Sequence, residues 1–145
     1  MILATRHVGI NVQDMDRMLH FWRDVMGLKV ELEVWNEGEF IDKLQALEGV
    51  KVHIIKLAAP DGSLIELLMD ITHPTPLPDP ARNRLCDRGI RHVAFTVADV
   101  DESYQILAAA GYEVLGEPIV SPDNYAKVFF CRDPEGNLLE IVQVL

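Results

Sequence analysis

Apolar and polar residues alternate along several short segments of the chain, and glycine and proline turns separate these segments. Residues 6–12 alternate and are rich in β-branched side chains, which predicts a strand. Apolar residues then recur at helical spacing, so we expect a helix that begins at a cap, Asp14 or Asp16, and runs to about Met26. Gly27 would end that helix. Further strands are expected over 28–35, 50–57 and 64–69, with a loop or short helix over 36–48.

The second half of the chain follows the same order of patterns. It predicts strands over 91–97, 112–116, 125–131 and 138–144, and a helix over about 100–110 that ends at Gly111. Each half therefore reads as a βαβββ module. The predicted fold class is α+β, with two tandem βαβββ modules.

An internal repeat supports this division. Residues 6–16 read RHVGINVQDMD and residues 91–101 read RHVAFTVADVD, with six of eleven positions identical. Later in each half, residues 60–68 read PDGSLIELL and residues 134–142 read PEGNLLEIV. Repeated segments in the same order indicate two copies of one supersecondary unit.

A proline-rich stretch lies between the two modules. Prolines stand at positions 74, 76, 78 and 80, and such a run fits neither a helix nor a central strand. We expect one domain over 1–145, made of module one at about 1–72, a connector at about 73–88 and module two at about 89–145. A short helix is expected within the connector, over 81–88.

The overall charge restricts the partners of this chain. The formal net charge is -10, from 13 Lys+Arg and 23 Asp+Glu. An acidic chain repels phosphate backbones and anionic bilayers, so neither nucleic acid nor a membrane is expected as the main partner. Short apolar runs, the absence of a signal-like leader and only two cysteines predict a cytoplasmic protein with free thiols.

The repeat supplies two histidines and two glutamates at matched places: His7, Glu66, His92 and Glu140. If a pseudo-twofold axis relates the modules, equivalent side chains approach a common point. Two imidazoles and two carboxylates suit a divalent ion of the Zn, Ni, Co, Mn or Fe group. A lone histidine at a strand start is more often structural, but the repetition of both residue types favours a metal site.

The chain resembles the vicinal oxygen chelate superfamily, also called the glyoxalase/bleomycin-resistance/dioxygenase superfamily. The segments that carry the resemblance are 6–30, 89–114 and 129–144; the last reads FFCRDPEGNLLEIVQV. The resemblance implies a curved mixed sheet around a metal cleft. It implies the same four ligands, from the first and last strands of each module. It also implies a small-molecule substrate, and a cleft formed within one chain or across a homodimer.

The ligand set is similar to that of lactoylglutathione lyase (glyoxalase I), and other segments resemble methylmalonyl-CoA epimerase. Two positions depart from these enzymes. Asn11 stands where glyoxalase I usually has an arginine, and Val52 or His53 stands where the bacterial epimerase has a glutamate base. These departures leave the substrate open.

The chemistry implied by the resemblance is proton transfer next to a metal-chelated carbonyl, through an enediolate or enolate. The expected base is Glu140 or, by symmetry, Glu66. Asn11 and Thr96 stand at equivalent positions of the repeat, and so do His53 and Lys127. These four residues are weaker candidates for substrate contacts. Two alternatives remain: a non-haem Fe(II) dioxygenase, and a metal-independent protein that binds an antibiotic.

Overall fold

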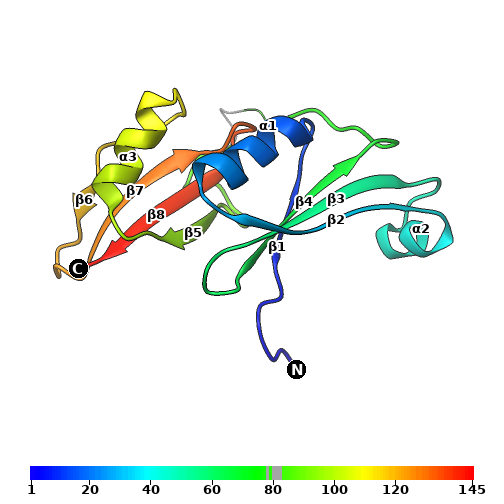
Figure 1. Cartoon of the computed structure of the whole chain (residues 1–145), viewed down its shortest axis with the longest axis horizontal. Helices are drawn as coiled ribbons and strands as arrows, with labels where there is room; N and C mark the ends of the chain where they lie inside the picture. Colours follow the sequence, from blue (N-terminus) through cyan, green and yellow to red (C-terminus); the bar gives the residue numbers. More distant parts are fainter. Residues whose placement is uncertain (78, 80–82) are drawn as a thin grey trace. The chain divides into compact units, whose positions relative to one another are not determined.

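The computed structural model describes residues 1–77, 79 and 83–145 (Figure 1). The chain divides into two compact units, Met1–Pro76 and Leu77–Leu145. Each unit contains one four-stranded mixed sheet. The strand order is β1-β4-β3-β2 in the first unit and β5-β8-β7-β6 in the second. These sheets with their few helices confirm the α+β fold class and the repeated βαβββ order.

The first unit contains, in chain order, β1 (Val8–Asn11), α1 (Met15–Leu19), the π-helix η1 (His20–Val25), β2 (Lys29–Glu37), α2 (Glu39–Gln45), β3 (Lys51–Ala58) and β4 (Leu64–Asp70). Strands β1 and β4 are parallel, and the other neighbours are antiparallel. The first and last strands of the unit therefore lie side by side in the sheet. This pairing brings the start of the unit next to its end.

The predicted helix after β1 is present, but its second half is a π-helix. Asp14 caps α1 by accepting a hydrogen bond from the backbone N–H of Arg17 at 3.0 Å. The helical segment ends before Gly27, whose φ of 78° lies in the left-handed region that glycine adopts at helix ends. Phe21 and Trp22 of η1 are fully buried and meet edge to face, with ring centroids 5.3 Å apart.

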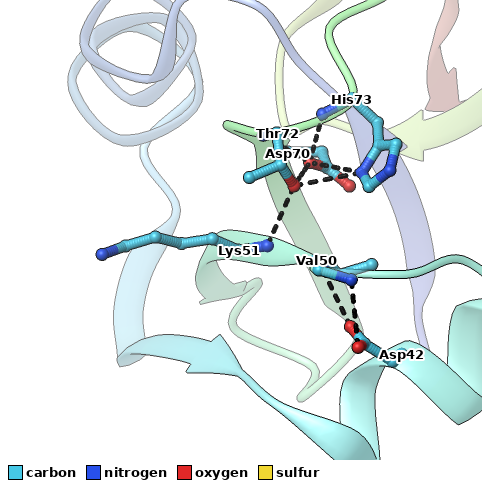
Figure 2. A network of polar contacts seen from close by, with 7 residues as sticks. Asp42, Val50, Lys51, Asp70, Thr72 and His73 are labelled. Carbon is cyan, nitrogen blue, oxygen red and sulfur yellow. Dashed lines mark hydrogen bonds and ion pairs between the residues drawn. The ribbon is translucent and has the colours of Figure 1, made fainter.

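Helix α2 occupies the segment that the sequence left as a loop or short helix. Its Ile41 is buried in a cluster with Val50, Val52 and Ile54. The Asp42 carboxylate accepts hydrogen bonds from the backbone N–H groups of Gly49 and Val50, at 3.0 and 2.8 Å, which fixes the helix to the start of β3 (Figure 2). This packing covers part of one face of the first sheet.

A second polar contact in Figure 2 joins the ends of two strands. The Thr72 hydroxyl accepts a hydrogen bond from the backbone N–H of Lys51, and Asp70 accepts hydrogen bonds from the backbone of Thr72 and His73. These bonds hold the first residue of β3 against the end of β4. The antiparallel register of β3 on β4 then runs without a break from Val52 to Ala58.

The second unit contains β5 (His92–Thr96), α3 (Val100–Ala109), β6 (Ile119–Val120), β7 (Ala126–Arg132) and β8 (Leu138–Val144). Asp99 caps α3 through the backbone N–H of Glu102. Tyr104 of α3 meets Phe129 of β7 edge to face, with ring centroids 5.6 Å apart. Helix α3 therefore covers the face of the second sheet that carries the odd-numbered residues of β7.

Two predictions about local structure are wrong. Residues 112–116 do not form a strand: only Val114 bridges to Cys131, and the second strand of this unit in chain order is the two-residue β6. The connector helix is absent over 83–88, where Arg84 binds Asp87 within turns, and residues 81–82 lie outside the described residues. Local side-chain bonding replaces helical bonding in this segment.

The two cysteines differ in exposure, and this difference predicts their reactivity. Cys86 is exposed, whereas Cys131 is buried and its burial raises the pKa of its thiol to about 12. Because the thiolate is the reactive form, we expect iodoacetamide at pH 8 to label Cys86 alone in the folded protein. Mass spectrometry of the labelled protein checks this. Labelling in urea provides the control, since both thiols should then react; native labelling of Cys131 would contradict its burial.

Candidate metal centre

The first histidine–glutamate pair forms where β1 and β4 lie side by side. Glu66 of β4 is in register with Gly9 of β1, so its side chain shares a face with His7, which precedes β1 by one residue. The Nε2 atom of His7 lies 3.2 Å from Oε2 of Glu66. The other carboxylate oxygen, Oε1, is 3.0 Å from the Nζ atom of Lys56 on β3. The buried Glu66 side chain thus has a charged or polar partner at each oxygen.

The second pair repeats this arrangement in the second unit. His92 begins β5, and Glu140 of β8 is in register with Ala94 of β5. The Nε2 atom of His92 lies 3.2 Å from Oε2 of Glu140. Phe130 occupies the place of Lys56 and meets the His92 ring edge to face, with centroids 5.4 Å apart. The two pairs therefore use the same atoms at the same separation, in different surroundings.

The donor atoms fit a divalent metal ion. Two donors bound to one ion at about 2.1 Å each, at roughly tetrahedral or right angles, lie about 3.0–3.4 Å apart. The 3.2 Å separations fall in this range as well as in that of a hydrogen bond. Among the described residues no group of three or more His, Cys, Asp or Glu side chains gathers as a metal site. Each unit by itself supplies two donors, fewer than the three protein ligands of a typical catalytic zinc site.

The Nδ1 atom of His7 is buried and has no hydrogen-bond partner among the residues that the structure describes. A metal-bound histidine usually donates its second ring N–H to a neighbouring acceptor, which fixes the ring. The His7 ring lacks that partner, and its orientation is set from the Nε2 side by Glu66.

Asn11 and Thr96 lie on the same faces as the two pairs. Asn11 is in register with Leu68, two residues beyond Glu66, and Thr96 is in register with Val142, two residues beyond Glu140. Side chains two residues apart on a strand share a face. Both positions therefore stay candidates for substrate contacts, one in each unit.

His53 and Lys127 lie on the opposite faces of their sheets, because each stands three residues from the strand position next to its glutamate. His53 is buried, stacks on Trp35 at a centroid distance of 4.3 Å and contacts Glu33 through Nε2 at 2.7 Å. Lys127 contacts Asp101 of α3, on the face that this helix covers. The strand register thus separates both side chains from the histidine–glutamate pairs.

Sequence reasoning overlooked Lys56. A lysine within the apolar run of β3, KVHIIKLA, was the available signal, because a charged side chain among buried neighbours usually has a specific partner. Its repeat equivalent is Phe130, so the comparison of the two halves did not point to it. Only the pairing of β3 with β4 places this ammonium at Glu66.

Comparison with known proteins decides the family. The profile of the Glyoxalase/Bleomycin resistance protein/Dioxygenase superfamily matches residues 5–141. The chain belongs to this superfamily. It is similar to the crystal structure of a glyoxalase family protein from Bacillus cereus, with 32% identity, a TM-score of 0.89 and coverage of 100% of this chain and 96% of that one. This confirms the resemblance seen in the sequence.

Other similar proteins have lower sequence identity to this chain. The uncharacterized protein YaeR of Escherichia coli (strain K12) is 29% identical, over 94% of this chain and 93% of that protein. A glyoxalase/bleomycin resistance protein/dioxygenase domain from Frankia sp. EAN1pec is 20% identical with a TM-score of 0.71, over the whole of both chains, which shows a shared fold. No helix in the described part of the chain is long and apolar enough to cross a membrane.

Proposed function

We propose that this glyoxalase-superfamily protein is a divalent-metal-dependent lyase or isomerase that acts on a small carbonyl compound. His7, Glu66, His92 and Glu140 are the proposed protein ligands of one ion, from the Zn, Ni, Co, Mn or Fe group. The observation that carries this proposal is the repeated pair: in both units Nε2 of the histidine lies 3.2 Å from Oε2 of the glutamate, at the same strand register.

The burial of the two carboxylates supports the proposal. Glu66 is a buried residue, and the side chain of Glu140 is 26% exposed, between apolar neighbours in β8. A buried carboxylate is costly unless it is paired or binds a cation. Glu66 already has the ammonium of Lys56 at 3.0 Å, so a further cation is needed most at Glu140, which contacts His92 at 3.2 Å.

The reaction requires a base next to the substrate. When bound, a divalent ion would stabilise the negative charge that develops on the substrate oxygens of an enediolate. A carboxylate oxygen of Glu140 or Glu66 takes the α-proton as the C–H bond breaks and its electron pair moves onto the carbonyl oxygen. In a lactoylglutathione lyase-like isomerisation, the same oxygen returns the proton to the neighbouring carbon, and the hydroxyl proton of the first carbon passes to the former carbonyl oxygen. In an epimerisation, the proton must instead reach the opposite face of the same carbon, so the other glutamate would have to deliver it.

Separate Glu140→Gln and Glu66→Gln variants test the base. A positioned general base contributes about 10²- to 10⁴-fold, so we expect at least one variant to lower the rate of solvent-deuterium exchange into substrate by about 100-fold or more. NMR follows the exchange with methylglyoxal–glutathione hemithioacetal and with methylmalonyl-CoA. Elemental analysis of each purified variant gives its metal content.

Glu102→Gln, an exposed change of the same type on α3, is the matched control and should alter neither quantity. The proposal fails if both glutamate variants keep their metal and the full exchange rate. A metal-free wild-type protein that still binds small molecules would favour the metal-independent binding alternative. Oxygen uptake by an iron-loaded protein would favour a dioxygenase.

A further inference from the structure

The ammonium group of Lys56 is held at the first histidine–glutamate pair. Its Nζ atom lies 3.0 Å from Oε1 of Glu66, the oxygen that does not face His7. The Lys56 side chain is 25% exposed, so part of it reaches solvent. An ammonium group has three N–H donors, and Glu66 is its ionic partner among the described residues. Two donors therefore remain for a further acceptor.

The other lysine of β3 is placed differently. Lys51 is an odd number of residues away and so lies on the opposite face of the sheet. It is 49% exposed and contacts Glu37 at 3.4 Å. Lys56 is thus the lysine of this strand whose charge lies on the face of Glu66.

The residues around Lys56 leave room on this face. In the row that crosses the sheet, Leu32, Lys56, Glu66 and Gly9 follow one another in register. Leu32 is exposed, and Gly9 has no side chain; a Cβ added there would meet only the Leu68 side chain, at 3.4 Å. Phe130 stands at the Lys56 position of the second unit, so this charge is present in one half of the repeat only.

Charge counting shows what the lysine changes. The two glutamates cancel the charge of a divalent ion when the histidines are neutral. Lys56 then leaves the group of residues with a single positive charge, which one negative charge on a bound molecule would cancel. Without Lys56 the same group would be neutral and would gain less from a charged ligand.

We propose that Lys56 is a specificity-determining residue, whose ammonium selects substrates whose chelating oxygens include a carboxylate or a comparable monoanionic oxygen. This proposal rests on the proposed metal-dependent function and names its substrate class. The anion accepts hydrogen bonds from the two N–H groups that Glu66 leaves open. Glu66 in turn keeps the ammonium from turning into solvent.

The test compares a charged and a neutral chelator of nearly the same shape, lactate and lactamide. Each is titrated into the cobalt-loaded full-length protein, and the visible absorption of Co(II) reports binding. In the Lys56→Met variant we expect the preference for lactate over lactamide to fall about tenfold, as expected for one partly screened charge pair. Lactamide should bind within about twofold of its wild-type affinity.

Lys56→Arg should keep the preference for lactate, because it keeps the charge and several donors. Lys51→Met, on the opposite face, is the matched control and should bind both compounds as the wild type does. Lys56→Gln serves if the methionine variant does not fold. Cobalt content, measured first, separates the two proposals. A wild-type protein that binds no metal overturns both, whereas a metal-loaded Lys56→Met variant with unchanged preference, or equal losses for both compounds, overturns the role of Lys56 alone.

Discussion

A His92→Ala variant is expected to bind divalent metal at least about 100-fold more weakly than the wild-type protein. Loss of a residue that only supports a metal ligand typically costs 10- to 100-fold in affinity, and loss of a ligand itself should cost at least as much. His92 contacts Glu140 at 3.2 Å, so its removal also leaves that carboxylate without its partner. Competition with a chromophoric chelator gives the dissociation constants. Proton exchange into substrate should fall with the bound metal.

His7→Ala should have a comparable effect, because the two histidines occupy equivalent places in the repeat. The control is His20→Ala. His20 is an exposed histidine on η1 that contacts Asp24 at 3.0 Å and belongs to neither histidine–glutamate pair. Its removal should leave metal affinity unchanged. Equal metal affinity in the His7, His92 and His20 variants would contradict the proposed ligand set.

A Phe21→Ala variant is expected to lower the free energy of unfolding of the first unit by about 3–5 kcal/mol. Phe21 is fully buried and packs against Trp22, so the change leaves a cavity and removes an aromatic contact. Urea unfolding, followed by both circular dichroism and tryptophan fluorescence, measures the loss. Both signals are needed because Trp22 is a direct neighbour of the cavity.

Phe40→Ala provides a matched control for this stability loss. Phe40 lies on α2 and is 73% exposed, so the same chemical change removes little buried surface there. Its effect should stay within about 0.5 kcal/mol. Similar losses in the two variants would mean that the packing of η1 against its sheet contributes less than its burial indicates.

Most elements were predictable because their signals are local. The cap at Asp14 and the left-handed Gly27 mark the two ends of one helical segment, and both are visible in the sequence. The π-helical turns of η1 were not predictable, because apolar spacing does not distinguish hydrogen bonds to the fourth residue from those to the fifth. The strand expected over 112–116 failed for a related reason. Its apolar residues suit a strand, but the segment meets β7 through one isolated bridge at Val114, with backbone hydrogen bonds at Glu113 and Leu115.

In the candidate site too, the sequence predicted some features, and only the tertiary structure decided the others. Because the repeat keeps one histidine and one glutamate in each half, all four proposed ligands were found from the sequence. His53 and Lys127 were nominated by the same repeat logic, yet the strand register places them on the other faces of the sheets. A repeat shows which positions are equivalent. It does not show which face of a sheet those positions occupy relative to residues of another strand.

The sequence by itself determined the family, the fold class and the four residues proposed to bind metal, because each depends on patterns that recur along the chain. The tertiary structure decided which side chains meet. It paired each histidine with its glutamate at 3.2 Å and placed the ammonium of Lys56 3.0 Å from Glu66. These contacts join residues that are distant in the sequence. They depend on the register between neighbouring strands, where a shift of one residue would turn each side chain to the opposite face.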